Sequence, residues 1–457
     1  MQYKDNKVTD MKIAYIGGGS RGWAWAFMAD LALESSISGK ITLYDIDKQA
    51  AVNNAKIGND LSARPDAKGK WHYETADTLK DALNGADFVI ISILPGSFDL
   101  MHVDVHLPER HGIYQSVGDT AGPGGMIRSM RTLPVFIEFA EAIREFAPDA
   151  WVINYTNPMS LCMQTLYHVF PEIKAFGCCH EVFGTQKVLR DILEKVTEIR
   201  GVDRRDIFVN VLGINHFTWF DSASYKGIDL FPLYRNYIDR HFEEGIAEGE
   251  EHWANSSFAS MNRVKFDLFR RYGLIAAAGD RHLVEFVDGS IYLKDPETVQ
   301  SWKFGLTHVD WRKANQIKKR ELAERLVRGE EELKLGESGE EGVLLIRALA
   351  GLSRIVSNVN IPNTAGQIAN LPRTAIVETN AIFERDAIRP IFAGSVPQDI
   401  LDLTMPHVKN HERILKAVLT KEHALVEEAF IHDPLISGRI SEAEARKLAQ
   451  DMLAATL

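Results

Sequence analysis

The amino-acid sequence predicts an α/β protein, with a doubly wound parallel sheet in its N-terminal part and an α+β domain behind it. Over about the first 200 residues, short apolar strands alternate with amphipathic helices. A glycine-rich turn joins the first strand to the first helix, and beyond Val211 long helices mixed with short strands replace this alternation. Because 457 residues exceed what one hydrophobic core usually organises, we expect two domains, residues 1–200 and 201–457.

The glycine-rich turn follows an apolar strand at residues 13–17 and fits G-x-G-x-x-G. Such glycines let the backbone approach a pyrophosphate at a helix N-terminus. The next strand, residues 41–44, ends on Asp45, whose carboxylate can accept hydrogen bonds from the ribose hydroxyls of NAD and repel the extra phosphate of NADP. The cofactor predicted is NAD, in a Rossmann-type domain. The residues expected to bind it are Gly17, Gly19, Ser20, Gly22 and Asp45.

The remaining elements continue this pattern. Further strands are expected at residues 88–93, 151–154, 175–178 and 208–213, and helices at about 130–146, after Pro158 and at 183–196. In the second part we expect helices at 311–333 and 342–352 and strands at 355–359 and 374–378. The resulting architecture is similar to that of lactate and malate dehydrogenases.

Composition narrows the class of protein. The net charge of −11 disfavours a nucleic acid or an anionic membrane as partner, and no apolar run reaches the length of a membrane span. The first residues hold no apolar signal segment. Three cysteines, of which Cys178 and Cys179 are adjacent, make no disulfide framework. We therefore expect a cytoplasmic protein.

Polar residues follow several of the predicted strands. In a parallel α/β sheet the ligand binds beyond the carboxyl ends of the strands, so these residues are expected to share one crevice. They are Asn157, Cys179, His180, Glu181, Asn215 and His216. A cysteine and a histidine from different strand ends could bind a divalent metal. The alternative is a core cysteine and a hydrogen-bonded structural histidine, because no spacing here is diagnostic of zinc.

Six motifs in order make the chain resemble glycoside hydrolase family 4. They are GGGS, DID, GDTAGPGG, NYTNP, CHEV and GINH, between residues 17 and 216. The resemblance implies a glycosidase that needs NAD and Mn²⁺ but consumes no NAD. The implied reaction oxidises carbon 3 of the sugar, eliminates the aglycone after a proton leaves carbon 2, adds water and returns the hydride.

The resemblance also implies roles for particular residues. Cys179 and His216 would be the metal ligands, with Asn157 beside them in contact with metal or substrate. Asp280 would be the base at carbon 2, although a turn or helix-capping aspartate is an equal alternative. His180, Asp119 and Glu181 are candidates for the general acid, a choice that depends on reach.

The residues after Cys179 bear on the substrate. The CHEV sequence resembles α-galacturonidases of the family, and the early part of LPGSF lacks the arginine that its phosphoglycosidases use. A uronate carboxylate needs cationic donors, for which Arg281, Arg128 and Arg131 are available, although each could instead form a structural ion pair. The predicted substrate-binding residues are Asn157, Glu181, Arg281 and His282.

Other functions stay open at this point. An α-galactosidase, α-glucosidase or α-glucuronidase of the same family would differ in few residues. A conventional NAD-dependent hydroxy-acid dehydrogenase would leave Cys179 and His216 unused, and an NAD-binding sensor would need neither metal nor substrate. The resemblance further implies a homodimer or homotetramer acting on a small saccharide.

Overall fold

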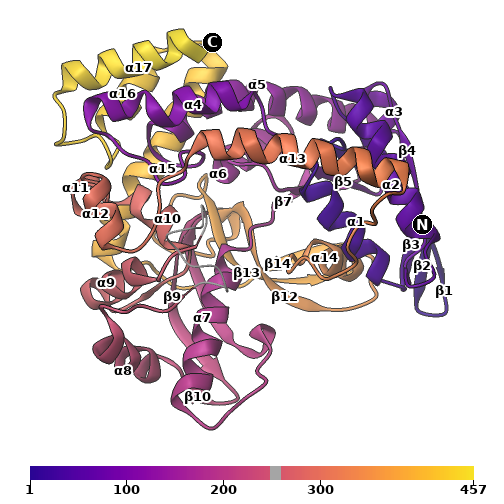
Figure 1. Ribbon diagram of the computed structural model, residues 1–457, viewed down its shortest axis with the longest axis horizontal. Helices are drawn as coiled ribbons and strands as arrows, with labels where there is room; N and C mark the ends of the chain where they lie inside the picture. The colour runs from indigo at the N-terminus through magenta and orange to yellow at the C-terminus, as the bar shows by residue number, and fades with distance from the viewer. Residues whose placement is uncertain (248–258, 457) are drawn as a thin grey trace.

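The fold is organised by one large sheet, shown in Figure 1 as a computed structural model that describes residues 1–247 and 259–456. Its parallel part has the strand order β4-β3-β2-β5-β6-β7, which is the 3-2-1-4-5-6 order of a doubly wound fold. These strands are β2 (Lys7–Ile16), β3 (Ile37–Tyr44), β4 (Trp71–Thr75), β5 (Phe88–Ile91), β6 (Trp151–Asn154) and β7 (Lys174–Gly177). The predicted parallel sheet is confirmed.

The sheet continues with strands from far along the chain. These are β12 (Ile355–Pro362), β13 (Ile376–Glu384) and β14 (Ala387–Pro390), and β1 (Gln2–Lys4) pairs with β2. β12 runs antiparallel to β7, where Asn360 faces Gly177. The division at residue 200 stays a prediction, and the chain beyond it contributes strands to the sheet that the first 200 residues begin.

A second, antiparallel sheet lies next to the first. It consists of β8 (Phe208–Ile214), β9 (Phe217–Tyr225), β10 (Ile228–Asp229) and β11 (Ile275–Ala276). The tight turn between β8 and β9 contains His216 at a φ of 64°. Left-handed backbone is uncommon for a residue with a side chain, so this turn holds the imidazole in a special orientation.

Helices cover both faces of the parallel sheet. In the N-terminal half these are α1 (Trp23–Leu33), α2 (Lys48–Ala63), α3 (Leu79–Leu83), α4 (Phe98–His106), α5 (Gly122–Phe146), α6 (Met159–Val169) and α7 (Glu181–Val196). The later part of the chain forms the helices α8 (Phe231–His241), α9 (Arg263–Tyr272), α10 (Asp280–Leu283), α11 (Gly289–Tyr292), α12 (Pro296–Ser301), α13 (Val309–Arg328), α14 (Gly342–Leu349), α15 (Gln398–Thr420), α16 (Ala424–Ile431) and α17 (Glu442–Thr456).

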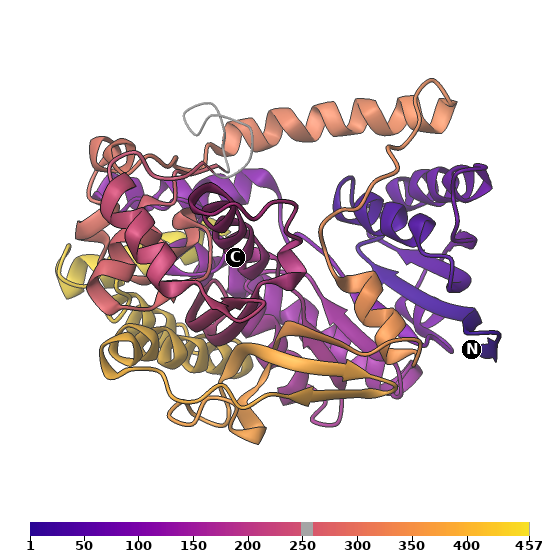
Figure 2. The same cartoon turned by 90° about the horizontal axis from the view of Figure 1, so that it is seen from below.

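Helix α13 returns from the C-terminal half to the N-terminal half. Figures 1 and 2 show this long helix bridging the two halves of the molecule, and it contacts α2 and α4. Its buried Ala323 and Leu326 belong to the same apolar cluster as Trp25 of α1. Residues far apart in sequence therefore close one side of the glycine-rich turn.

The sheet is buried on both faces, as parallel sheets are. Along β2, Ile13 and Tyr15 pack into one apolar cluster, whereas Ala14 and Ile16 pack into another on the opposite face. This explains why residues 13–16 of β2 are all apolar. None of the helices formed by residues 1–247 and 259–456 is long and apolar enough to span a bilayer.

Two helices differ most from the predicted bounds. α5 begins at Gly122, before the predicted start near residue 130, because Pro123 stands in its first turn, where its missing N–H costs nothing. α13 ends at Arg328 and not at residue 333, because Gly329 adopts left-handed backbone with a φ of 72° and stops the helix.

Candidate active site

The glycine-rich turn connects β2 to α1 at the carboxyl edge of the parallel sheet. Gly17 has a φ of 91°, and a Cβ there would lie 2.0 Å from the Ser92 carbonyl oxygen, so only glycine fits. Gly22 caps α1, and the described residues give this helix end neither a side-chain cap nor an acidic residue in its first turn. The N–H groups of this helix end are therefore open to an anion, as a dinucleotide diphosphate requires.

Side chains around the turn fix its shape. One Asp45 carboxylate oxygen accepts a 2.8 Å hydrogen bond from Gly19 N–H, and the other accepts one of 2.8 Å from Asp47 N–H. The buried Asn54 amide donates to the Gly18 and Ser20 carbonyls at 2.8 and 3.0 Å. Asn54 was not predicted, because it lies on α2 outside any motif. The roles of Gly17, Gly19, Ser20, Gly22 and Asp45 toward NAD stay predictions that this geometry fits.

A group of possible metal ligands lies deeper in the crevice. Asp119, His216 and His282 each offer an atom within 4.8 Å of the others. The centroids of the two imidazole rings are 3.8 Å apart with 35° between the ring planes, and Thr120 Oγ1 lies 3.1 Å from His216 Nδ1. His282 Nδ1 is buried without a hydrogen-bond partner among the described residues. Two imidazoles, a carboxylate and an orphaned ring nitrogen fit a divalent cation.

The charges of this group suit metal binding. Burial opposes ionisation of Asp119, but nearby Arg128, His282 and His216 bring its pKa down to about 2. Burial lowers the pKa of His216 to about 3, helped by the neighbouring His282. A carboxylate and a neutral imidazole are the forms that coordinate metals, so no proton needs to be displaced from either at neutral pH.

Cys179, a predicted metal ligand, is not one of the three grouped residues. Its thiol is buried, and its pKa is raised well above the usual value by burial and by the nearby Glu378 and Glu181 carboxylates. Its thiol also interacts with the side chain of Asn215, the residue before His216. Cys179 as a ligand stays a prediction, since a bound cation would favour the thiolate.

Glu181 and His180 join the metal-ligand group to the surface. Glu181 accepts a 2.6 Å hydrogen bond from Gly279 N–H, and its other oxygen lies 3.6 Å from His282 Nε2 and 3.9 Å from His180 Nε2. Burial by itself would raise the pKa of Glu181, but the histidines at positions 282, 180 and 216 outweigh burial and bring this pKa down to about 2. Glu181 therefore carries a negative charge between the two imidazoles.

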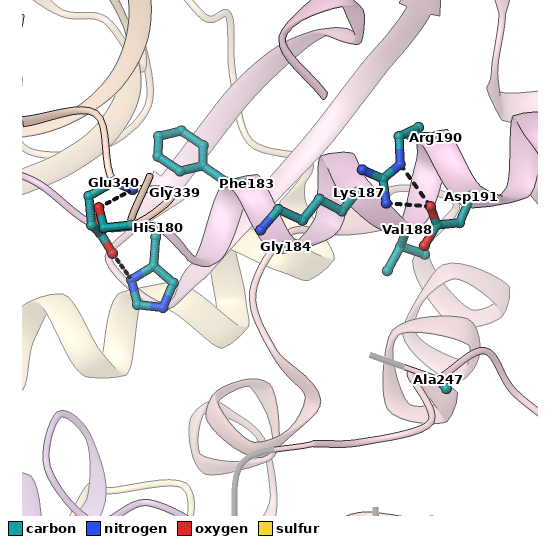
Figure 3. Close-up of a pocket in the computed structure, with 11 residues that line it drawn as sticks. His180, Phe183, Gly184, Lys187, Val188, Arg190, Asp191, Ala247, Gly339 and Glu340 are labelled. Atoms are coloured by element: carbon teal, nitrogen blue, oxygen red, sulfur yellow. Dashed lines mark hydrogen bonds and ion pairs between the residues drawn. The ribbon is translucent and has the colours of Figure 1, made fainter. Parts of the chain in front are cut away.

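His180 stands at the wall of a pocket of 470 Å³, which Figure 3 shows. Its Nδ1 lies 2.9 Å from a Glu340 carboxylate oxygen, and half of its side chain is exposed. Desolvation lowers the pKa of His180, but the hydrogen bond to Glu340 and the charge of Glu181 raise it to about 9. The ring of Trp23, next to Gly22, lies 6.1 Å from the His180 ring, so these contacts link the glycine-rich turn to the metal-ligand group.

Asp280 has a different environment from the one predicted for a base. It is fully buried, and its two oxygens each accept a 3.1 Å hydrogen bond, one from Val264 N–H and one from Lys265 N–H in the first turn of α9. This is the helix-capping alternative that the sequence left open. Its role as a base stays a prediction that this geometry does not support.

The three candidate arginines also differ. Arg281 is buried and donates to the carbonyls of Ser116 and Gly305, so it links two loops, and its role as a substrate contact stays a prediction. Arg131 pairs with Asp104. Arg128 donates at 3.3 Å to the carbonyl of Asn157, whose buried Oδ1 has no partner among the described residues, and its charge acts on Asp119. Arg128 therefore lies beside Asn157 and near Asp119 of the metal-ligand group.

A polar network behind the site was not predicted. Glu378 of β13 is buried and accepts hydrogen bonds from Asn215 at 3.2 Å and from Asn358 at 2.6 Å, and Asn358 also donates to the Cys179 carbonyl at 3.2 Å. These contacts hold the turn before His216 against the end of β7. No local signal could reveal them, because β13 lies about 200 residues away in sequence from the loops it supports.

The fold and the site together define a dinucleotide-binding type of α/β protein with a candidate metal centre beside the cofactor crevice. The chain matches the family 4 glycosyl hydrolase model over residues 12–195 and the family 4 glycosyl hydrolase C-terminal domain over residues 211–436. It belongs to glycosyl hydrolase family 4, as the motifs predicted.

Similar proteins extend this result. The chain is 65% identical to the alpha-galacturonidase of Lachnoclostridium phytofermentans, over 100% of this chain and 98% of that protein. A Bacillus subtilis crystal structure described as a glucosidase is 52% identical, covers 97% of this chain and 100% of its own, and has a TM-score of 0.92. A 6-phospho-alpha-glucosidase from gut microorganisms, solved with NAD and Mn²⁺, shares the fold with 21% identity over 98% of each chain and a TM-score of 0.78.

Proposed function

We propose that this glycosyl hydrolase is an α-galacturonidase that uses NAD and Mn²⁺ to release galacturonic acid from small saccharides. The observation that carries the proposal is the 65% identity, along the whole chain, to a protein named alpha-galacturonidase. The structure supports it with an open helix N-terminus at the glycine-rich turn and a group of three metal-competent side chains in the same crevice.

The chain supplies binding and orientation for this chemistry. Bound NAD and a divalent cation provide reversible oxidation of a sugar carbon and polarisation of its oxygens. The glycine-rich turn would hold the diphosphate of the cofactor. Asp119, His216 and His282 would hold the cation, with Cys179 as a predicted further ligand. Because the hydride is returned to the sugar, hydrolysis proceeds without accumulation of NADH.

Geometry separates the candidates for the proton donor to the leaving oxygen. Asp119 belongs to the metal-ligand group, and Glu181 is occupied by Gly279 N–H and His282. His180 is half exposed in the pocket of Figure 3, with Glu340 on its Nδ1 and its Nε2 toward Glu181. We infer that His180 is the general acid, since it is the most exposed of the three.

Arg128 is the arginine that we assign to the uronate carboxylate. It lies in the crevice beside Asn157 and Asp119, whereas Arg131 and Arg281 are engaged elsewhere. A guanidinium can bind a carboxylate through two parallel hydrogen bonds, and a neutral galactoside offers no such partner. The α-galactosidase, α-glucosidase and α-glucuronidase alternatives are outcomes of the experiment below.

The cellular context of the enzyme is a further part of the proposal. Cys162, Cys178 and Cys179 are all free and buried, which suits a reducing cytoplasm. We also propose a homodimer or homotetramer, the assembly that the family resemblance implies. Size-exclusion chromatography with light scattering tests this state, and a monomeric mass would contradict it.

Release of p-nitrophenol from α-linked glycosides tests the function. The panel contains the galacturonide, glucuronide, galactoside, glucoside and 6-phosphoglucoside, with NAD, Mn²⁺ and a thiol reductant omitted one at a time. We expect the galacturonide to be the best substrate, with hydrolysis that requires NAD and Mn²⁺ and leaves absorbance at 340 nm unchanged. Steady NADH formation from simple hydroxy acids, without glycoside cleavage, would instead establish the dehydrogenase alternative.

A further inference from the structure

Helix α13 brings a lysine to the glycine-rich turn from outside the parallel sheet. A Cβ placed on Gly22 would lie 3.0 Å from the Lys319 ammonium nitrogen. Figures 1 and 2 show how α13 spans the molecule to reach this place. The ammonium group therefore lies at the N-terminal end of α1.

The charge of Lys319 has no counterpart among the residues that the structure describes. Lys319 forms no hydrogen bond or ion pair with any residue in the described ranges, whereas Lys313 on the same helix pairs with Asp99 at 2.7 Å. The nearby acids are engaged, since Asp45 accepts from Gly19 N–H and Asp47 pairs with Arg21. A helix N-terminus carries partial positive charge, so an ammonium placed there repels it unless an anion lies between them.

Arg312 and Lys319 of α13 lie near the metal-ligand group and the glycine-rich turn, respectively. Arg312 lies seven residues earlier, which is two helical turns, so both side chains project from one face of the helix. Arg312 is half-buried near Asp119, whose charge acts on it, while Lys319 is at the glycine-rich turn. One face of α13 thus follows the crevice from the metal-ligand group to the cofactor turn.

We propose that Lys319 binds the diphosphate of NAD and closes the cofactor crevice from the side opposite the glycine-rich turn. The proposal rests on the proposed function, because it takes NAD as the anion at this helix end. It also fits the chemistry of that function. A cofactor that is regenerated in place need not leave between turnovers, so an added ionic contact that slows its release does not limit the rate.

The test measures NAD binding to the purified protein by calorimetry, without metal or sugar. We expect Lys319→Ala to raise the Kd for NAD about five- to tenfold, mostly through faster dissociation, and Lys319→Arg to stay within about threefold of the unchanged protein. Lys318→Ala is the matched control, because Lys318 is the neighbouring exposed lysine of the same helix and, unlike Lys319, does not come within 4 Å of a Cβ placed on Gly22. Equal Kd values for Lys319→Ala and Lys318→Ala would overturn the proposal.

A second comparison separates a diphosphate contact from a general role of α13 in shape. ADP-ribose carries the diphosphate, and adenosine does not. We expect Lys319→Ala to weaken ADP-ribose as much as NAD and to leave displacement by adenosine unchanged. Equal weakening of both would overturn the assignment to the diphosphate. Failure of the unchanged protein to bind NAD would count against the proposed function itself, which distinguishes the two failures.

Discussion

The cofactor turn and the metal-ligand group are connected through Trp23, His180 and Glu181 but are built in different ways. The cofactor turn comes from one continuous stretch, residues 17–45, and works through backbone N–H groups that glycine leaves accessible. The metal-ligand group comes from three separate segments, the loop at residue 119, the β8–β9 turn at residue 216 and helix α10 at residue 282, and works through side chains. Adding a side-chain atom to a glycine should therefore damage the turn, whereas removing a ligand side chain should damage the metal-ligand group.

The largest effect is expected from His216→Ala. Loss of one imidazole from the three-residue group should lower metal-dependent hydrolysis by more than about 100-fold. Mutation of residues that only support metal ligands already costs about 10- to 100-fold in metal affinity or activity. Manganese titration and glycoside hydrolysis measure this, and the Kd for NAD should stay within about twofold. Full activity would refute His216 as a ligand.

Cys179→Ser sharpens the same comparison. Metal affinity that falls as far as in His216→Ala would establish the thiol as a ligand. Retained affinity would leave Asp119, His216 and His282 as the ligand set, with Cys179 a buried neighbour.

Gly17→Ala should break the cofactor turn. The new Cβ would lie 2.0 Å from the Ser92 carbonyl in left-handed backbone, so we expect a loss of about 2–4 kcal/mol in the free energy of unfolding and at least tenfold weaker NAD binding. Gly22→Ala is the matched variant, because its Cβ meets only the flexible Lys319 ammonium. We expect it to keep the stability of the protein. Equal destabilisation by both, in chemical denaturation, would contradict this account of the turn.

Asp280→Asn decides between a base and a helix cap. The carboxylate accepts from two backbone N–H groups of α9, so the variant should lose about 1 kcal/mol of stability and keep exchange of the carbon-2 proton with deuterated solvent. Thermal unfolding and NMR of the substrate measure the two effects. Lost exchange at unchanged stability would restore Asp280 as the base.

An effect that appears only at acid pH concerns the stability of the region beneath the metal-ligand group. Buried His407 has its Nε2 2.9 Å from the Phe286 carbonyl, and Phe286 stacks on Phe217, next to His216. Burial lowers the pKa of His407 from 6.5 to about 4, so the unfolded chain binds more protons below pH 6.5. The contribution of neutral His407 is therefore present above about pH 6.5 and is lost as the pH falls through 4.

His407→Gln should remove this pH dependence while keeping an N–H donor to Phe286. Between pH 6.5 and 4 its free energy of unfolding should fall less steeply than that of the unchanged protein, by at most about 1.4 kcal/mol per pH unit. Parallel curves in urea denaturation across this range would contradict the role of His407.

Sequence by itself determined the parts that depend on local backbone geometry. Gly17 is required where the chain turns against Ser92, and an apolar run such as β2 must be buried on both faces, so the turn, the parallel strands and the family followed from the order of residues. Each of these features leaves its signal within a short stretch of sequence, even though Gly17 meets Ser92 only in the fold. The candidate ligand His216 was also visible, since it follows a predicted strand.

Tertiary structure alone decided which side chains meet. Asp119 and His282 were predicted in other roles, and only folding groups them with His216. The backbone N–H groups of α9 determine that Asp280 caps a helix, and only the path of α13 carries Lys319 to Gly22. These contacts join segments tens to hundreds of residues apart. Their energies depend on distances that no local pattern encodes, which is why the sequence could nominate these residues but not assign their partners.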